Sequence, residues 1–337
     1  WDEERGVVQS GLLMDGAISA DGKTSVLTSL FSILVSTDSS ASYAAVPGLG
    51  GPLQGAYMFN GNSMAAVGNL AILPSSGLSP GSVSGLAVST DGAGEVWSVI
   101  QVMDETSCRY GAFPSENTWY ISAGMWNTDQ TASNSTVSDG AKWHIKSDTG
   151  FGHRLTKNIH IGERSTKKVH RGVKQAPVKG KGDSTTGWWG SIYKTTDAGA
   201  TFTNVYNSPA DALWYFNMIS CGSESTCFAA AEGDNYVGLW VTTDGGANWT
   251  ESWTSTEGEG LMACKMTSAT DGFFAPTIKN GRVAETPFYY TTDAGATWKN
   301  TQTLSNAVVM DLDQVGSLGV ATILNTATSQ MEIATLM

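Results

Sequence analysis

Short apolar runs separated by turn residues recur along the chain. Clear examples are residues 215–220, 227–231 and 238–242, followed by 260–266, 272–276 and 287–291. β-branched and aromatic runs bounded by Gly, Ser and Asp are typical of strands, and no amphipathic helical period competes with them. The pattern therefore predicts an all-β protein.

A short phrase follows every third predicted strand. It is TDAGATF at 196–202, TDGGANW at 243–249 and TDAGATW at 292–298. A degenerate copy lies at 32–43, and looser copies lie at 89–97 and 138–143. The aspartates of the six copies are 47 to 58 residues apart: Asp38, Asp91, Asp139, Asp197, Asp244 and Asp293. Self-similarity at a nearly fixed period predicts a repeat architecture.

The chemistry of the phrase predicts a tight hairpin. Its aspartate can accept hydrogen bonds from backbone N–H groups further along, and a glycine two residues later permits positive φ. The aromatic residue that follows, Phe202, Trp249 or Trp298, begins the next strand and can bury a large apolar surface. Each repeat is therefore expected to be a four-stranded blade in which the phrase joins the third and fourth strands.

The end of the chain suggests one further blade. Three apolar runs at 307–312, 318–324 and 330–337 resemble the first three strands of a blade, and residues 1–10 are the expected donor of the fourth. Closure of this kind removes an open sheet edge. We therefore predict a seven-bladed β-propeller with four-stranded antiparallel blades, closed by N- and C-terminal strands, as a single domain over residues 1–337.

The repeated phrase resembles the Asp box, the S/T-x-D-x-G-x-T/S-W signature of BNR-like propellers. Residues 242–249 and 291–298 are also similar to the T-T-D-G-G-x-x-W hairpin of the photosystem II stability and assembly factor family. That resemblance implies a seven-bladed scaffold that binds protein partners, in which the boxes are structural. It implies a protein partner or self-assembly and no cofactor.

Sialidases also contain such boxes, so an enzyme is the alternative. That family has an arginine cluster, a nucleophilic tyrosine with a partner glutamate, and an acid/base aspartate. In this chain only Arg5, Arg109 and Arg282 lie outside the basic segment, and none is in the family's Arg-Ile-Pro context. No motif singles out a pair among the 31 acidic residues. We therefore expect a non-enzymatic propeller with no catalytic, cofactor-binding or metal site.

Cysteines and glycosylation motifs bear on the compartment. Cys221 and Cys227 flank a predicted turn, at a spacing that allows a disulfide across a hairpin, whereas Cys108 and Cys264 are expected to be free. Asn134 and Asn248 begin N-x-S/T triplets. No apolar run is long enough to span a membrane. These features favour a secreted glycoprotein or a component of an extracellular surface assembly, with the thylakoid lumen as the alternative.

A basic segment interrupts the acidic chain. Nine basic residues against two acidic ones give residues 153–183 a charge of +7, so the rest of a chain of net charge −12 has −19. We predict an insertion here, in place of the early strands of the fourth blade. Lys167, Lys168 and Arg171 are its candidate anion-binding residues. The candidate external ligands are an anionic glycan and a membrane surface, and nucleic acid is not expected. Packing on the protein's own acidic surface is the favoured interpretation.

Overall fold

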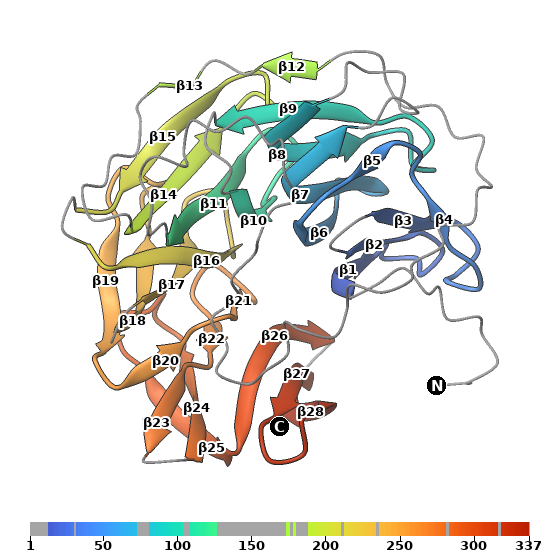
Figure 1. Cartoon of the computed structure of the whole chain (residues 1–337). Coiled ribbons are helices and arrows are strands. Elements are labelled where there is room, and N and C mark those ends of the chain that lie inside the picture. Colours follow the sequence, from blue (N-terminus) through green and yellow to red (C-terminus); the bar gives the residue numbers. More distant parts are fainter. Residues whose placement is uncertain are drawn as a thin grey trace.

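The protein consists of strands and turns arranged around a common centre (Figure 1). The computed structural model describes residues 13–29, 32–72, 81–103, 108–126, 173–175, 178–179, 188–209, 212–233, 236–280, 283–315 and 318–336. Every regular element in these ranges is a strand, and the strands form six sheets. The prediction of an all-β propeller is therefore confirmed.

The six sheets follow one another along the chain as blades. Blade 1 comprises β1 (Leu13–Ile18), β2 (Ser25–Ser29), β3 (Ile33–Ser36) and β4 (Ala44–Ala45). Blade 2 comprises β5 (Leu49–Gly50), β6 (Leu53–Phe59), β7 (Ser63–Ile72), β8 (Gly81–Ser89) and β9 (Ser98–Met103), with β12 (Val173–Gln175) added at its edge. Blade 3 comprises β10 (Cys108–Ala112), β11 (Trp119–Trp126), β14 (Trp188–Thr195) and β15 (Phe202–Asn207), with β13 (Val178–Lys179) added.

The remaining blades are also antiparallel. Blade 4 comprises β16 (Trp214–Cys221), β17 (Cys227–Gly233), β18 (Tyr236–Thr242) and β19 (Thr250–Ser255). Blade 5 comprises β20 (Gly258–Gly260), β21 (Cys264–Met266), β22 (Gly272–Phe274), β23 (Thr277–Asn280), β24 (Val283–Thr291) and β25 (Lys299–Ser305). Blade 6 has three strands, β26 (Ala307–Val315), β27 (Leu318–Asn325) and β28 (Gln330–Leu336).

The predicted number of seven blades is wrong, because the sheets number six. The second and third strands of blade 3, β11 and β14, pair along their full length from Trp119↔Thr195 to Trp126↔Trp188. Residues 127–187 are therefore an insertion within that blade. The insertion is about as long as one repeat, so its aspartate at position 139 matched the period without marking a blade. Closure by residues 1–10 falls outside the described residues.

The basic segment also lies elsewhere than predicted. It was expected to replace early strands of a fourth blade, but it belongs to the insertion between β11 and β14. Two of its short pieces are strands that run parallel to the outermost strands of two blades: β12 pairs with β9, and β13 pairs with β15. The described parts of the segment therefore extend two existing sheets.

Successive blades are joined by shared apolar cores. One buried cluster combines Ile33 of blade 1 with Trp97 of blade 2, and another combines Val67 of blade 2 with Phe202 of blade 3. A third joins blades 3 and 4, and the largest extends from blade 4 through blade 5 to blade 6. Because successive blades bury their faces against each other, the core is a series of local clusters.

Candidate functional site

The repeated phrase forms the same turn in five blades, which we call the aspartate turns: Asp38, Asp91, Asp197, Asp244 and Asp293. In each turn the Ser or Thr two residues earlier donates its hydroxyl to the aspartate, at 2.7 to 2.9 Å. In all five turns the aspartate also accepts the backbone N–H four residues later. Hydrogen bonds led by Ser42 lower the pKa of Asp38 to about 2, and those led by Thr291 do the same for Asp293.

Two residues of each turn have a left-handed backbone, and they are successive in every turn except that of blade 2, where they are Gly92 and Gly94. In blade 5 these are Ala294 (φ 56°) and Gly295 (φ 84°), and the N–H of Ala294 donates to the carbonyl of Thr270 at 2.8 Å. The equivalent bond joins Gly245 to Ser225 in blade 4. The turn is thus fixed to another loop of its own blade, between β21 and β22 in blade 5 and between β16 and β17 in blade 4.

The glycines of the aspartate turns pack against the preceding blade. A Cβ placed at Gly94, Gly199 or Gly295 would approach Val35, Ile100 or Val241 of that blade to 3.0 Å or less. The glycine is therefore required by close packing as well as by its positive φ. These contacts make the aspartate turns structural joints between blades.

The tryptophan that follows the turn finds different surroundings in blades 4 and 5. Trp298 donates its indole N–H to the Ser252 hydroxyl at 2.8 Å, and that hydroxyl donates to the Gly295 carbonyl. Ser252 occupies the register shift of β19, and Val205 occupies the same shift in β15. Trp249 is 8% exposed, and its buried indole N–H has no partner among the described residues. A valine in place of the serine explains that unpaired donor.

We expect Val205→Ser to stabilise the protein, because a hydroxyl there can accept from the Trp249 indole. The expected gain in free energy of unfolding is about 1 kcal/mol, measured by urea denaturation. In a Trp249→Phe background the same substitution should give no gain. Equal effects in both backgrounds would show that the hydroxyl does not contact the indole. Ser252→Val, the converse change, should destabilise the protein.

Most of the other residues predicted from the sequence lie outside the described ranges, and one lies within an aspartate turn. Asp139, Asn134 and the candidate anion-binding residues Lys167, Lys168 and Arg171 are outside the described residues. Asn248 is exposed, and its side-chain amide donates to Asp244 at 2.7 Å within an aspartate turn. The predicted residues that the structure describes are therefore spread over five blades and do not converge on one site.

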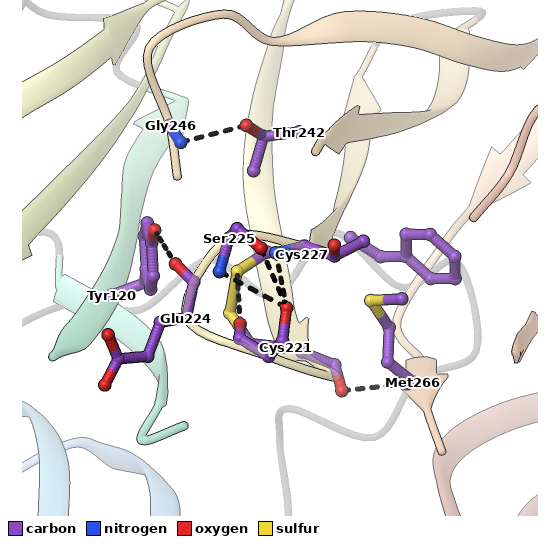
Figure 2. The surroundings of a disulfide bond; sticks show 12 residues. Tyr120, Cys221, Glu224, Ser225, Cys227, Thr242, Gly246 and Met266 are labelled. Carbon is purple, nitrogen blue, oxygen red and sulfur yellow. Dashed lines mark hydrogen bonds between the residues drawn. A yellow bond between two sulfur atoms is a disulfide. The ribbon is translucent and has the colours of Figure 1, made fainter. Parts of the chain in front are cut away.

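A disulfide joins Cys221 to Cys227 across the hairpin of β16 and β17 (Figure 2). The loop that it closes contacts blade 3, where the Tyr120 hydroxyl donates to the Glu224 carbonyl at 2.8 Å. The backbone N–H of Met266 in blade 5 donates to Ser220 at 3.0 Å. The disulfide loop therefore lies where three blades meet.

The other two cysteines, Cys108 and Cys264, are free and fully buried. Burial raises the pKa of each thiol to about 12. A thiol that stays protonated at neutral pH is a poor nucleophile, so these cysteines act as small core residues.

The outer edges of the blades differ in what covers them. β12 and β13 cover β9 and β15, whereas β19 and β25 are the last strands of their sheets in the described structure. β25 is exposed along nearly its whole length. An open groove of about 300 Å³ lies beside β15, lined by Thr201, Thr203, Lys194 and the glycines of the neighbouring aspartate turn. An uncovered edge strand offers unpaired backbone groups to another chain.

The innermost strands form a second candidate region around the axis. Five of them, β1, β6, β10, β16 and β26, have a register shift against the second strand of their blade. Such bulges redirect side chains and are frequent next to functional sites. Three of the shifts lie next to or contain charged residues: Asp15 of β1, Arg109 of β10 and Asp311 of β26.

Two carboxyl groups lie on innermost strands of the first and the last blade, Asp15 on β1 and Asp311 on β26. Both are half-buried, and each accepts a backbone N–H from the residue that follows it, at 2.7 and 2.8 Å. Asp15 also accepts the N–H of Ala56 in blade 2 at 2.8 Å. Burial raises the pKa of Asp311 to about 6. Burial and then the charge of Asp311 raise the pKa of Asp15 well above its usual range.

The inner strands of other blades also have polar groups with partners. Lys265 of blade 5 forms an ion pair with Asp313 at 2.7 Å. Arg109 donates to Asn217 at 2.6 Å, and its guanidinium lies 4.5 Å from the centre of the Tyr215 ring. The Tyr57 hydroxyl accepts the N–H of Gly111 at 2.8 Å. The axial region is thus a polar cluster built by the inner strands.

We expect Asp311→Asn to stabilise the protein at high pH. Because the folded-state pKa is raised, the stability that this carboxyl contributes is present at low pH and is lost as pH rises through about 6. The pKa shift of Asp311, discounted because the side chain contacts solvent, corresponds to a gain in free energy of unfolding of about 2 kcal/mol for Asp311→Asn at pH 8. The gain should be smaller at pH 5. Urea unfolding at both pH values measures it.

Asp313→Asn is the matched control for this prediction. It removes a neighbouring carboxylate that already has Lys265 as a partner, so no stabilisation at pH 8 is expected. A gain for Asp311→Asn that is the same at pH 5 and pH 8 would contradict the raised pKa of Asp311.

Sequence reasoning missed the axial carboxyls. The available signal was an aspartate inside an apolar run, in LMDGAI of β1 and in AVVMDLDQV of β26. A charged residue at an inner strand position is costly unless it is paired or functional. The two runs lie at opposite ends of the chain, so nothing in the sequence indicated that they meet.

Comparison with known proteins identifies the fold of this chain. No family model and no curated protein sequence matches the chain. An oligogalacturonate lyase from Vibrio parahaemolyticus matches with 10% identity, over 96% of this chain and 77% of that one, at a TM-score of 0.53. The GH74 xyloglucanase from Xanthomonas campestris matches with 11% identity, over 95% and 46%, at a TM-score of 0.51.

Two further similarities are weaker. YCF48 bound to a D1 peptide matches 43% of this chain with 17% identity, at a TM-score of 0.31 that supports no argument. The chain spans less than half the length of the GH74 enzymes that it matches, 36% of the Niastella koreensis enzyme and 46% of the Xanthomonas enzyme. At these identities the similarities concern the fold, and the chain has the fold of a β-propeller.

Proposed function

We propose that this protein is a non-catalytic β-propeller that binds extended segments of partner proteins along the outer edges of its blades. The observation that supports this proposal is the pairing of β12 with β9 and of β13 with β15. Two outer edges thus accept an added strand in parallel orientation. Strand addition to a sheet edge is a general mode of peptide recognition, in which backbone hydrogen bonds give affinity.

The same geometry leaves further edges for a partner. β19 and β25 are outermost strands with no added strand in the described structure. The disulfide between Cys221 and Cys227 favours an oxidising compartment, so we place the protein outside the cytosol, as a secreted or surface-assembly component. The alternative is a photosystem assembly factor located in the thylakoid lumen. Among the described residues no helix is long and apolar enough to cross a membrane.

The chain's own added strands provide a probe for strand addition. Because Trp126 and Trp188 are paired, an Asn-Gly turn can replace residues 127–187 and close the hairpin of β11 and β14. A labelled peptide of residues 171–181 should bind this shortened variant more tightly than the full chain, as measured by fluorescence anisotropy. A peptide with K174P and K179P, which lacks two backbone donors, should bind more weakly.

Two results would overturn the proposal. The first is no difference between the two peptides on a shortened variant whose circular dichroism and tryptophan fluorescence match those of the full chain. The second concerns the sialidase-like alternative: release of sugar from sialosides by the purified chain, lost in Asp311→Asn, would assign a catalytic role instead.

A further inference from the structure

The groove beside β15 lies between blade 3 and the aspartate turn of blade 4. Blade 3 contributes Lys194 of β14 and Thr203 and Val205 of β15, and the turn contributes Gly245 and Gly246. Its volume of about 300 Å³ lies at the lower end of the range of small-molecule sites. The groove is therefore formed by two neighbouring blades and is large enough for a small ligand or a single side chain.

The joint between these two blades is packed less closely than the equivalent joints. A Cβ added at Gly246 would approach Tyr120 and Val205 to 3.4 Å, which is ordinary van der Waals contact, and the indole nitrogen of Trp249 to 3.5 Å. At the equivalent glycines of blades 2, 3 and 5 the same atom would approach a side chain to 3.0 Å or less. The turn of blade 4 therefore leaves room for one heavy atom beside the Trp249 indole.

Two hydrogen-bond donors adjoin this space. The indole N–H of Trp249 is buried and has no partner among the described residues. The Lys194 ammonium donates to the Gly245 carbonyl at 2.7 Å and lies 5.1 Å from the centre of the Tyr120 ring. The same ring lies edge-on to Trp249, with 6.5 Å between the ring centres. Since an ammonium has three N–H groups, Lys194 has donors left for a ligand.

The next joint shows what satisfies such an indole. Between blades 4 and 5 the Ser252 hydroxyl accepts the Trp298 indole N–H at 2.8 Å and donates to the Gly295 carbonyl. Between blades 3 and 4 the position of that serine is occupied by Val205, which has no acceptor. A buried donor without a partner costs free energy, and an oxygen from a ligand can supply that partner.

The chemistry of the two donors selects a carboxylate. Burial lowers the pKa of Lys194, although the charges of Glu224 and Asp244 raise it. Among the described residues no carboxylate forms an ion pair with Lys194. Its ammonium has thus lost hydration without gaining an ion pair, and hydrogen bonds between charged groups are the strong ones. A phosphate dianion would be repelled more strongly by Glu224 and Asp244 than a singly charged carboxylate.

We propose that Lys194 and the Trp249 indole N–H form a binding site for a carboxylate group in the groove between blades 3 and 4. One oxygen accepts from the ammonium, and the other enters the space over Gly246 and accepts from the indole. The exposed hydroxyls of Thr201 and Thr203 line the groove and can contact the rest of the ligand. The site uses side chains rather than a strand edge, so it does not depend on strand addition.

The test follows the Trp249 indole directly. The full chain with isotope-labelled tryptophan is titrated at pH 7.5 and constant ionic strength with lactate, which has one carboxylate and one hydroxyl. In the NMR spectrum the indole N–H signal of Trp249, assigned by its absence in Trp249→Phe, should move downfield as the N–H gains an acceptor. Inorganic phosphate should bind more weakly than lactate, and tighter binding of phosphate would overturn the choice of a carboxylate.

Two lysine variants test the charged contact. Lys194→Met should weaken lactate binding about tenfold or more, the equivalent of one lost charge-assisted hydrogen bond. Lys299→Met is the matched control, because Lys299 lines another groove, beside the aspartate turn of blade 5. Its affinity for lactate should equal that of the unmodified chain. Thermal unfolding of both variants excludes loss of fold as the cause.

Val205→Ser tests the indole contact without a loss of stability. Its hydroxyl should accept the Trp249 N–H in place of the ligand, so the affinity for lactate should fall about threefold or more while the protein becomes more stable. The proposal is overturned if Lys194→Met binds lactate as tightly as the unmodified chain does. It is also overturned if Lys299→Met weakens binding as much as Lys194→Met, or if the Trp249 signal stays in place while lactate binds.

Two arms distinguish the source of the carboxylate. A blocked Gly-Asp-Gly tripeptide represents an acidic side chain of a protein partner, and lactate represents a free organic acid. Tighter binding of the tripeptide assigns the site to a partner's side chain, and tighter binding of lactate assigns it to a small molecule. Absence of binding by both, with a folded chain, overturns the proposal.

Discussion

Trp97→Ala should lower the free energy of unfolding by about 3 to 5 kcal/mol, the range for removal of a large buried aromatic side chain. Trp97 is fully buried and lies in the core cluster that combines Val26 and Ile33 of blade 1 with Met64 of blade 2. Its indole N–H also donates to the Gly94 carbonyl at 2.9 Å. The substitution removes both the packing between two blades and the hydrogen bond within the aspartate turn. Urea denaturation followed by circular dichroism measures the loss.

Trp97→Phe separates the two contributions. It keeps most of the buried aromatic surface and removes the indole N–H, so we expect a loss of about 1 to 2 kcal/mol. A loss below 1 kcal/mol for Trp97→Ala would mean that blades 1 and 2 are not joined through this side chain.

Gly222→Ala should destabilise the protein by about 3 kcal/mol, the upper range for inserting a methyl group into a closely packed contact. A Cβ at position 222 would overlap the carbonyl oxygen of Ser268, in the loop of the neighbouring blade 5. The atoms that the new Cβ would meet belong to the backbone, so the two loops must move apart. Because Gly222 lies inside the loop closed by Cys221 and Cys227, the disulfide limits how far its own loop can move. Thermal unfolding measures the effect.

Gly81→Ala is the control for this substitution. A Cβ at Gly81 meets no atom within 4 Å, so stability should change by less than about 0.5 kcal/mol. A similar loss for both variants would show that the cost comes from backbone conformation and not from contact between blades 4 and 5.

Local chemistry was sufficient to predict the repeating unit. The aspartate, the hydroxyl two residues before it and the flexible residues after it lie within about six positions, so their hydrogen bonds depend little on the rest of the chain. The strands around Asp244 and Asp293 likewise followed from alternating apolar and turn residues. The sequence therefore indicated an all-β propeller built from antiparallel blades.

The number of blades needed the tertiary structure. Residues 127–187 are as long as one repeat and contain an aspartate, so the period by itself could not show that β11 pairs directly with β14. Hydrogen bonding between Trp126 and Trp188 decides that they are neighbours in one sheet. Strand pairing across an insertion depends on distant segments, which no local pattern reports.

The sequence by itself determined the strands, the aspartate turns and the acidic character of the protein, because each depends on residues close together in the chain or on composition alone. Only the tertiary structure decided which side chains meet. Packing places the turn glycines against the preceding blade and buries Asp15 and Asp311 on the inner strands of the first and the last blade. Burial raises the pKa of both carboxyls, and burial depends on how distant segments pack.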